Sequence, residues 1–250
     1  MKSADSPANR TSNGMKIIAH RGARNIKTEN TISSLKWAAN LGVDAIETDV
    51  RVTKDKKLVV CHDKNLKRIY GLDKDISSLT FEEIRRLESD GHGSVPTLKE
   101  VMELELGKPL ILDIKDPGSA GLIHQALSRY NIKNLWSVTS LFPDDLAYLK
   151  RLYPALDMTL QTYKHPFQDI KIAKKIKASN INFVLYLLNP LTYHLARRAG
   201  LKVRTYQNYL SFLLNSPFIV RILGWIYPQI SIYTDRPDKI VPVINRHSKI

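Results

Sequence analysis

The sequence predicts a (β/α)8 barrel, and three observations lead to that prediction. The chain has 250 residues, a size that a single barrel domain commonly reaches. Hydrophobic residues make up 43% and charged residues 25%, which are values of a globular protein rather than a disordered or fibrous one. Short β-branched or apolar runs alternate with longer helical patterns, and this alternation favours a parallel sheet. A doubly wound open sheet is the competing architecture.

The first half of the chain supplies four predicted strands. They are KIIAH (16–20), AIETDV (45–50), LVVCH (58–62) and PLILDIK (109–115). A helix is expected over residues 31–40, between the first two strands. The gap between the second and third strands is too short for a parallel crossover, so we expect residues 50–62 to form a hairpin excursion.

The second half continues the alternation with five predicted strands. They are LWSVTS (135–140), DMTLQT (157–162), NFVLYL (182–187), KVRTYQ (202–207) and ISIYTD (230–235). Helical patterns lie between them at 143–153, 167–177 and 191–199. Without the hairpin strand, eight strands remain, and this number matches a closed (β/α)8 barrel.

The ends of the chain and its cysteine content define the expected organisation. Residues 1–14 lack the apolar stretch of a secretory signal and are expected to form a disordered polar tail before a single domain at 15–250. The most apolar stretch, 209–233, is interrupted by prolines and an arginine, so we expect no transmembrane helix. Cys61 is the single cysteine, which excludes an intramolecular disulfide. We expect a cytoplasmic protein.

Charge is distributed unevenly along the chain. The net charge of +14 divides into +2 for residues 1–116 and +12 for residues 117–250. A basic half indicates an anionic partner, which can be a phosphate substrate, an acidic membrane surface or a nucleic acid. Charge alone does not choose among the three.

Acidic side chains stand where predicted barrel strands end, and in barrels this edge builds the active site. Glu47 and Asp49 share one face of their strand, and Asp113 and Lys115 share one face of theirs. Carboxylates that face inward from neighbouring strands repel each other unless they are neutralised. Mg²⁺ or Ca²⁺ is the usual partner of such a set, because both prefer carboxylate oxygens. The pattern therefore predicts a divalent-metal site.

Two histidines and two cations complete the set. His20 and Arg21 end the first strand, and His62 ends the hairpin. One imidazole can take a proton from a nucleophile while the other gives a proton to a leaving alkoxide. Arg21 and Lys115 offer positive charge to a phosphate. Together with the metal site, these residues predict metal-assisted phosphoryl transfer.

This constellation resembles the glycerophosphodiester phosphodiesterase family, and the similarity covers about residues 15–240. It rests on His20-Arg21-Gly22, Glu29-Asn30-Thr31, GVDAIETDVRVTKDKKLVVCHD (42–63), PTLKEV (96–101), LILDIK (110–115) and TDRPD (234–238). The resemblance implies a (β/α)8 barrel, a divalent metal, and hydrolysis of glycerophosphodiesters to glycerol 3-phosphate and an alcohol. We expect a small-molecule or lipid phosphodiester as substrate and no nucleic-acid partner.

The resemblance also implies a role for each site residue. The family's catalytic histidines fall on His20 and His62, its metal carboxylates on Glu47, Asp49 and Asp113, and its phosphate-binding cations on Arg21 and Lys115. Glu29 matches an acidic residue near the glycerol-binding end, where it would support Arg21 or His20. Asn208 matches an asparagine that follows the seventh barrel strand.

Two departures from the family pattern concern the substrate. The family usually has Glu where this chain has Asp113, and the shorter side chain predicts a shifted cation or a bridging water. Sphingomyelinase D-type phospholipases are similar to this chain in having Asp there. The family's Trp-Thr-Val-Asn at the seventh strand is replaced by Thr205-Tyr206-Gln207-Asn208, which concerns recognition of the alcohol more than the chemistry.

An apolar segment at 209–229 follows the seventh strand and is expected near the active-site mouth. It predicts either a lipid-facing lip or additional core. Two alternatives to the main prediction remain. One is a lysophospholipase D or sphingomyelinase D-like enzyme that cleaves a lipid phosphodiester. The other is an inactive barrel that binds an anionic surface or nucleic acid. The sequence leaves the oligomeric state open.

Overall fold

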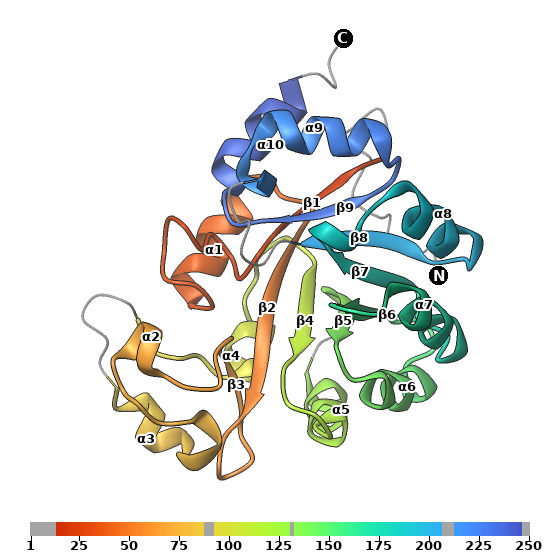
Figure 1. Ribbon diagram of the computed structural model, residues 1–250. Helices are drawn as coiled ribbons and strands as arrows, with labels where there is room; N and C mark the ends of the chain where they lie inside the picture. Colours follow the sequence, from red (N-terminus) through yellow and green to blue (C-terminus); the bar gives the residue numbers. More distant parts are fainter. Residues whose placement is uncertain (1–13, 88–92, 131–132, 207–212, 247–250) are drawn as a thin grey trace.

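In the computed structural model, eight of the nine described strands form one closed parallel sheet (Figure 1). The structure describes residues 14–87, 93–130, 133–206 and 213–246, so the predicted tail lies almost wholly outside it. The strands are β1 (Lys16–Ala19), β2 (Ala45–Val52), β3 (Leu58–Val60), β4 (Leu110–Ile114), β5 (Leu135–Ser140), β6 (Asp157–Thr162), β7 (Asn180–Val184), β8 (Lys202–Tyr206) and β9 (Ser231–Thr234).

Strand pairing confirms the predicted barrel and the predicted hairpin. The order β1-β9-β8-β7-β6-β5-β4-β2 closes because β1 pairs in parallel with both β9 and β2. This closure makes an eight-stranded ring and rules out the open sheet. β3 lies outside the ring and pairs antiparallel with β2, with Val50 opposite Val60.

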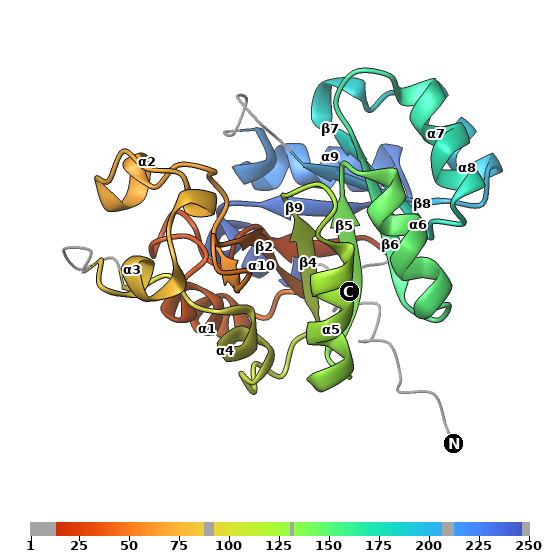
Figure 2. The same ribbon diagram turned by 90° about the horizontal axis from the view of Figure 1, so that it is seen from below.

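Helices surround the ring, and their first residues explain where they begin. Thr31 caps α1 by accepting a hydrogen bond from the amide of Ser34, and proline opens α6, α7, α8 and α9. The helices are α1 (Ile32–Asn40), α2 (Lys67–Tyr70), α3 (Phe81–Arg85), α4 (Leu98–Met102), α5 (Ala120–Arg129), α6 (Pro143–Leu152), α7 (Pro166–Lys175), α8 (Pro190–Arg198), α9 (Pro217–Ile226) and α10 (Pro237–Arg246). The insert with β3, α2 and α3 lies on the opposite side of the barrel from α7 and α8 (Figures 1 and 2).

The structure differs from the sequence prediction in two places. The strand expected at 182–187 begins at Asn180 and ends at Val184, and Leu185–Leu187 forms a short 3-10 helix, η2. In the described part of the apolar segment 209–229, Leu213–Asn215 forms a 3-10 helix, η3, and Pro217–Ile226 forms α9. No described helix is long and apolar enough to cross a membrane.

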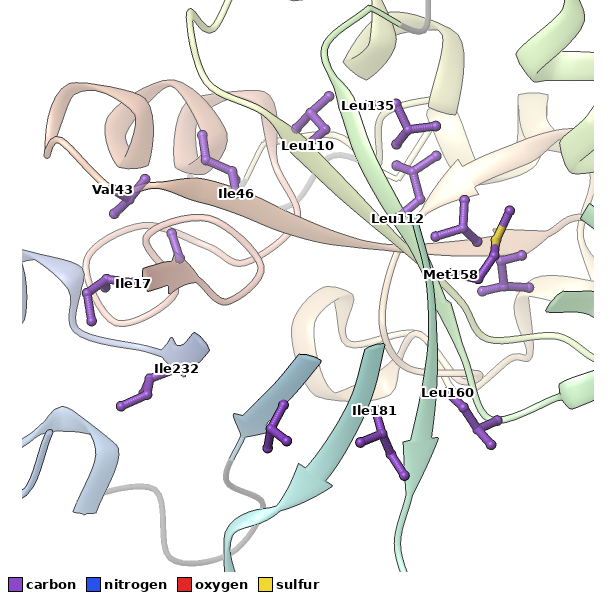
Figure 3. Packing of buried hydrophobic residues seen from close by; sticks show 14 of the residues in the cluster. Ile17, Val43, Ile46, Leu110, Leu112, Leu135, Met158, Leu160, Ile181 and Ile232 are labelled. Atoms are coloured by element: carbon purple, nitrogen blue, oxygen red, sulfur yellow. The ribbon is translucent and has the colours of Figure 1, made fainter. Parts of the chain in front are cut away.

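The main hydrophobic core lies between the ring and its helices. Ile17, Ile46, Leu112 and Ile181 belong to it, and Figure 3 shows how such side chains project from successive strands. Strand side chains alternate between two faces. Glu47, Asp49 and Asp113 directly follow or precede Ile46, Val50 and Leu112 of this core, so the three carboxylates face the interior of the ring. The core therefore fixes which carboxylates point into the barrel.

Candidate active site

A cavity of about 420 Å³ opens at the carboxyl ends of the barrel strands, which we call the mouth. Residues from both halves of the chain meet there, as expected for a barrel active site. The lining residues are His20, Arg21, Arg24, Glu47, His62, Asp63, Arg68, Asp113, Lys115, Thr139, Gln161, Tyr163, Asn182, Tyr206 and Tyr233. Most of the residues predicted from the sequence therefore share one cavity.

Three buried carboxylates form a cluster beside this cavity. Each of Glu47, Asp49 and Asp113 offers one oxygen, and these oxygens lie within 4.8 Å of one another. Asp49 and Asp113 face each other in the register of β2 and β4. Lys115 joins them, with its Nζ 3.0 Å from Oδ1 of Asp49 and 2.5 Å from Oδ2 of Asp113. Gln161 donates to the same oxygen of Asp113 at 2.9 Å.

The electrostatics of the cluster favour a further cation. Burial raises the pKa of Glu47 well above its usual range, and Asp49 and Asp113 raise it further. Burial also acts to raise the pKa of Asp49, but Lys115 and Arg21 hold it well below its usual range. Oδ1 of Asp113 has no hydrogen-bond partner among the described residues. A set of hard oxygen donors that repel one another fits Mg²⁺ or Ca²⁺.

The turn after β1 presents Arg21 to the cluster. Its backbone is left-handed, with φ of 55°, and its amide donates to Oε2 of Glu47 at 2.9 Å. Gly22 is also left-handed, and a Cβ there would lie 2.8 Å from the backbone carbon of Ser34. Only glycine fits this position, which explains the third residue of His20-Arg21-Gly22. The left-handed Arg21 is a strained conformation of the kind found at functional sites.

Each candidate histidine pairs with an aspartate through Nδ1. Nδ1 of His20 lies 2.7 Å from Oδ1 of Asp235, and Nδ1 of His62 lies 2.7 Å from Oδ1 of Asp63. The backbone carbonyl of His62 also accepts a hydrogen bond from Nε of Arg51 at 2.7 Å. In both pairs the aspartate fixes the ring and leaves Nε2 to the cavity.

Glu29 connects the two histidine–aspartate pairs. Its carboxylate lies 2.9 Å from Nη1 of Arg21, 2.9 Å from Nε of Arg24 and 2.6 Å from Nη2 of Arg68. Arg24 reaches Asp235 at 3.7 Å, and Arg68 reaches Asp63 at 2.5 Å. Burial acts to raise the pKa of Glu29, but the three arginines lower it below its usual value.

Asn30 explains the middle of Glu29-Asn30-Thr31. Its amide Nδ2 donates to Oδ2 of Asp49 at 2.8 Å, and its Oδ1 accepts from Thr48 and from the amide of Asp49. The backbone of Asn30 is left-handed, a conformation that asparagine tolerates. Asn30 therefore orients one of the clustered carboxylates.

The sequence reasoning missed several of these residues. Asp63 directly follows His62, and Asp235 is the aspartate of Thr234-Asp235 in TDRPD. The His–Asp pair and the TDRPD motif were therefore the signals that could have identified them. Arg24, Arg68 and Gln161 carry no signal in one sequence, because only the fold brings them to the mouth. Asn208 lies outside the described residues.

The wall formed by β5 to β8 is uncharged. It consists of Thr139, Gln161, Asn182 and Tyr206, all nearly fully buried. Oε1 of Gln161, both amide atoms of Asn182 and the hydroxyls of Thr139 and Tyr206 have no hydrogen-bond partner within the described residues. The cavity thus has a charged side on β1, β2 and β4 and a neutral hydrogen-bonding side opposite.

Comparisons with known proteins agree with this geometry. A glycerophosphodiester phosphodiesterase of Caldanaerobacter subterraneus is 28% identical over 201 residues, which cover 75% of this chain and 83% of that protein. The human lysophospholipase D GDPD1 is 33% identical over 135 residues, which cover 48% of this chain and 43% of that protein. The structure of an Oleispira antarctica phosphodiesterase in complex with the product sn-glycerol-3-phosphate matches with a TM-score of 0.83 at 22% identity and covers 92% of this chain and 96% of that one.

A family model also matches the chain. Residues 20–209 match the glycerophosphoryl diester phosphodiesterase family. The matched region begins at His20 and contains the carboxylate cluster, both histidines and Lys115. The chain therefore belongs to the glycerophosphoryl diester phosphodiesterase family.

Proposed function

We propose that this phosphodiesterase hydrolyses glycerophosphodiesters to glycerol 3-phosphate and an alcohol. The observation that carries the proposal is the convergence of two histidines, three carboxylates and two cations on one cavity. Family membership supports the reaction class. The related Oleispira antarctica structure with sn-glycerol-3-phosphate supports the product.

We assign a divalent metal to Glu47, Asp49 and Asp113. The buried triad and the unpartnered Oδ1 of Asp113 support this assignment. A bound cation supplies positive charge that stabilises negative charge on phosphoryl oxygens. Mg²⁺ and Ca²⁺ both suit carboxylate ligands, and Asp113 in place of glutamate leaves more room for water between protein and ion.

Arg21 and Lys115 bind the phosphate in this proposal. Burial acts to lower the pKa of Lys115, but Asp113 and Asp49 raise it above its ordinary value, so the ammonium stays charged. Asp49 and Glu29 hold Arg21 in the same way. Both cations line the cavity and face an incoming phosphodiester.

His20 and His62 act as the acid–base pair through Nε2. One imidazole takes the proton of the nucleophile, which is water or the neighbouring glycerol hydroxyl of the substrate. The other gives a proton to the oxygen of the leaving alcohol. Attack by the glycerol hydroxyl would form a cyclic phosphate, which water then opens. Either histidine can fill either role in this geometry.

The remaining candidates act on the substrate or support the site. Glu29 supports Arg21 directly, because their side chains form an ion pair at 2.9 Å. The neutral wall with Gln161 and Asn182 faces the alcohol side of the substrate. Asn208 stays a proposed substrate contact outside the described residues.

A lipid phosphodiester is the second candidate substrate. The human relative named lysophospholipase D and the aspartate at position 113 favour this class. Exposed apolar side chains at the mouth, Leu141, Phe167 and Leu191, favour it independently. The alternative of an inactive binding barrel has less support, because His20, His62 and Lys115, to which we assign the chemistry, line one cavity.

Membrane contact through 209–229 also stays a proposal. α9 exposes Phe218 in its first turn, and this side chain suits contact with a lipid surface. The expectation that this whole segment lies near the mouth is wrong. A Cβ on Gly224 would touch Met15, which precedes the first residue of β1, so Trp225 lies toward the opposite end of the barrel. We propose a cytoplasmic enzyme that contacts a membrane peripherally.

Turnover of two substrates tests the reaction. We expect hydrolysis of glycerophosphocholine or lysophosphatidylcholine that is lost in EDTA and restored by Mg²⁺ or Ca²⁺. His20→Ala should lose turnover even with added metal, because it removes one member of the acid–base pair. The preferred substrate decides between the two candidate classes. Turnover that survives both EDTA and His20→Ala would contradict the proposed mechanism.

A further inference from the structure

Exposed apolar side chains gather on one side of the mouth. Leu141 follows β5 and is 39% exposed, Phe167 follows β6 and is 50% exposed, and Leu191 follows β7 and is 58% exposed. Tyr186 at 57% and Phe218 at 70% continue the series after β7 and β8. We call these five residues the apolar lip. All of them lie at the carboxyl ends of strands, because each stands between a barrel strand and the first turns of the next helix.

The opposite side of the mouth has a different chemistry. Arg24, in the β1–α1 connection, and Arg68, on α2, line the cavity there and remain partly exposed. Figures 1 and 2 show α2 on the side of the barrel away from α7 and α8. The first turns of α7 and α8 carry Phe167 and Leu191. The entrance is therefore apolar on one side and cationic on the other.

Net charge reinforces this asymmetry. From the start of β5 to the end of α9, residues 135–226 contain 12 basic and four acidic residues. Lys164, in the connection between β6 and α7, is exposed at the mouth of this half. Lys174, Arg197 and Arg198 are exposed in the last turns of α7 and α8, toward the other end of the barrel, and add to the long-range potential of this half. An anionic surface is attracted to the same half of the barrel that carries the apolar lip.

We propose that the apolar lip docks the protein on an anionic lipid surface with the catalytic cavity facing that surface. The inference rests on the proposed function for the cavity but uses none of its catalytic residues. A protein partner on the lip would cover the entrance to the cavity. A lipid surface covers it too, but also presents phosphodiesters directly to the site. Charge and position together therefore select lipid as the occupant.

The apolar lip provides the short-range attraction, and the basic half provides the long-range attraction. Each large apolar side chain that leaves water strengthens partitioning, and surface cations add to it on anionic lipid. Replacing two residues of the lip with serine should weaken vesicle binding about tenfold or more, even if their side chains enter the lipid only partly. High salt should weaken binding further, because it screens the basic helices.

Vesicle co-sedimentation with a matched pair of variants tests the docking. The vesicles are phosphatidylcholine alone and phosphatidylcholine mixed with phosphatidylglycerol. The test variant is Phe167→Ser with Leu191→Ser. The control is Leu152→Ser with Ile226→Ser, because Leu152 and Ile226 are each 44% exposed on the same half, at the far ends of α6 and α9. Turnover of soluble glycerophosphocholine and the melting temperature are measured for both.

We expect the full chain to bind the anionic vesicles, the lip variant to lose about tenfold or more, and the control to bind as the parent does. Failure of the parent to bind, or equal loss in both variants, overturns the docking. Soluble turnover separates the two proposals. If vesicle binding follows the lip while neither the parent nor a variant hydrolyses glycerophosphocholine or lysophosphatidylcholine, the docking stands and the proposed reaction fails.

Discussion

Nδ1 of His20 lies 2.7 Å from Oδ1 of Asp235, so a hydrogen bond joins the residues that directly follow the first and last strands of the barrel. The two residues are 215 positions apart in sequence. Burial lowers the pKa of His20, while the hydrogen bond to Asp235 acts in the opposite direction. Ring orientation therefore depends on Asp235, because this contact fixes which nitrogen faces the cavity.

Asp235→Asn should lower kcat on glycerophosphodiesters by about 10²- to 10⁴-fold, since a misoriented imidazole transfers protons poorly. KM should change little, because Asp235 is not among the residues that line the cavity. Steady-state kinetics measure both parameters. Asp238→Asn is the control, because Asp238 pairs with Arg236 away from the cavity and should leave kcat unchanged. An Asp235→Asn enzyme with parental kcat would show that His20 needs no orienting partner.

Glu29→Gln should affect both stability and turnover, since Glu29 holds three arginines. Removal of one partner from a buried ion-pair network costs about 3 kcal/mol, and we expect a loss of that size at pH 7. Denaturant unfolding measures it. Glu103→Gln is the control, because Glu103 forms a solvent-exposed pair with Lys99 and should lose little stability.

The pH dependence of this loss has a definite sign. The three arginines lower the pKa of Glu29 below its usual value, against the effect of burial. The stabilisation is therefore complete above the unfolded pKa of about 4.3 and is lost as the pH falls through the folded pKa. The difference in unfolding free energy between the parent and Glu29→Gln should shrink in acid. A difference that grows as the pH falls would contradict the arrangement.

Glu47→Gln should separate metal binding from stability. Burial and the neighbouring carboxylates raise the pKa of Glu47, so its charge is unfavourable without a cation. We expect the variant to be as stable as the parent or more stable in EDTA, by up to about 1 kcal/mol. Mg²⁺ or Ca²⁺ should raise the melting temperature of the parent and not that of the variant. An equal rise in both proteins would place the ion elsewhere.

Local sequence patterns predicted the fold because the barrel repeats one unit. Each strand shows as a short apolar run, and Pro143, Pro166 and Pro190 mark helix starts that follow such runs. The carboxylate cluster was predictable because Glu47 and Asp49 alternate with apolar Ile46 and Val50 along one strand. Asp113 and Lys115 alternate in the same way at the end of β4.

Long-range pairing was the part that sequence could not supply. The contacts of Glu29 with Arg24 and Arg68 join a loop, a turn and an inserted helix, and no period connects these positions. α9 was difficult for another reason. Its buried residues Val220 and Gly224 and its exposed residues Phe218 and Trp225 are all uncharged, so hydrophobicity alone does not distinguish the buried face from the exposed one.

Gly22→Ala should damage the site by disturbing the backbone of the turn, although Gly22 contributes no functional group of its own. At φ of 79° an alanine is strained, and its Cβ would lie 2.8 and 2.9 Å from the backbone carbon and oxygen of Ser34. Strain and overlap together predict a loss of about 3 kcal/mol. Gly71→Ala is the matched control, because Gly71 has φ of 70° and open space around its Cβ position, so strain alone predicts about 1 kcal/mol. Thermal and denaturant unfolding compare the two variants. Equal losses would mean that Ser34 gives way and that the turn carrying Arg21 tolerates a side chain at position 22.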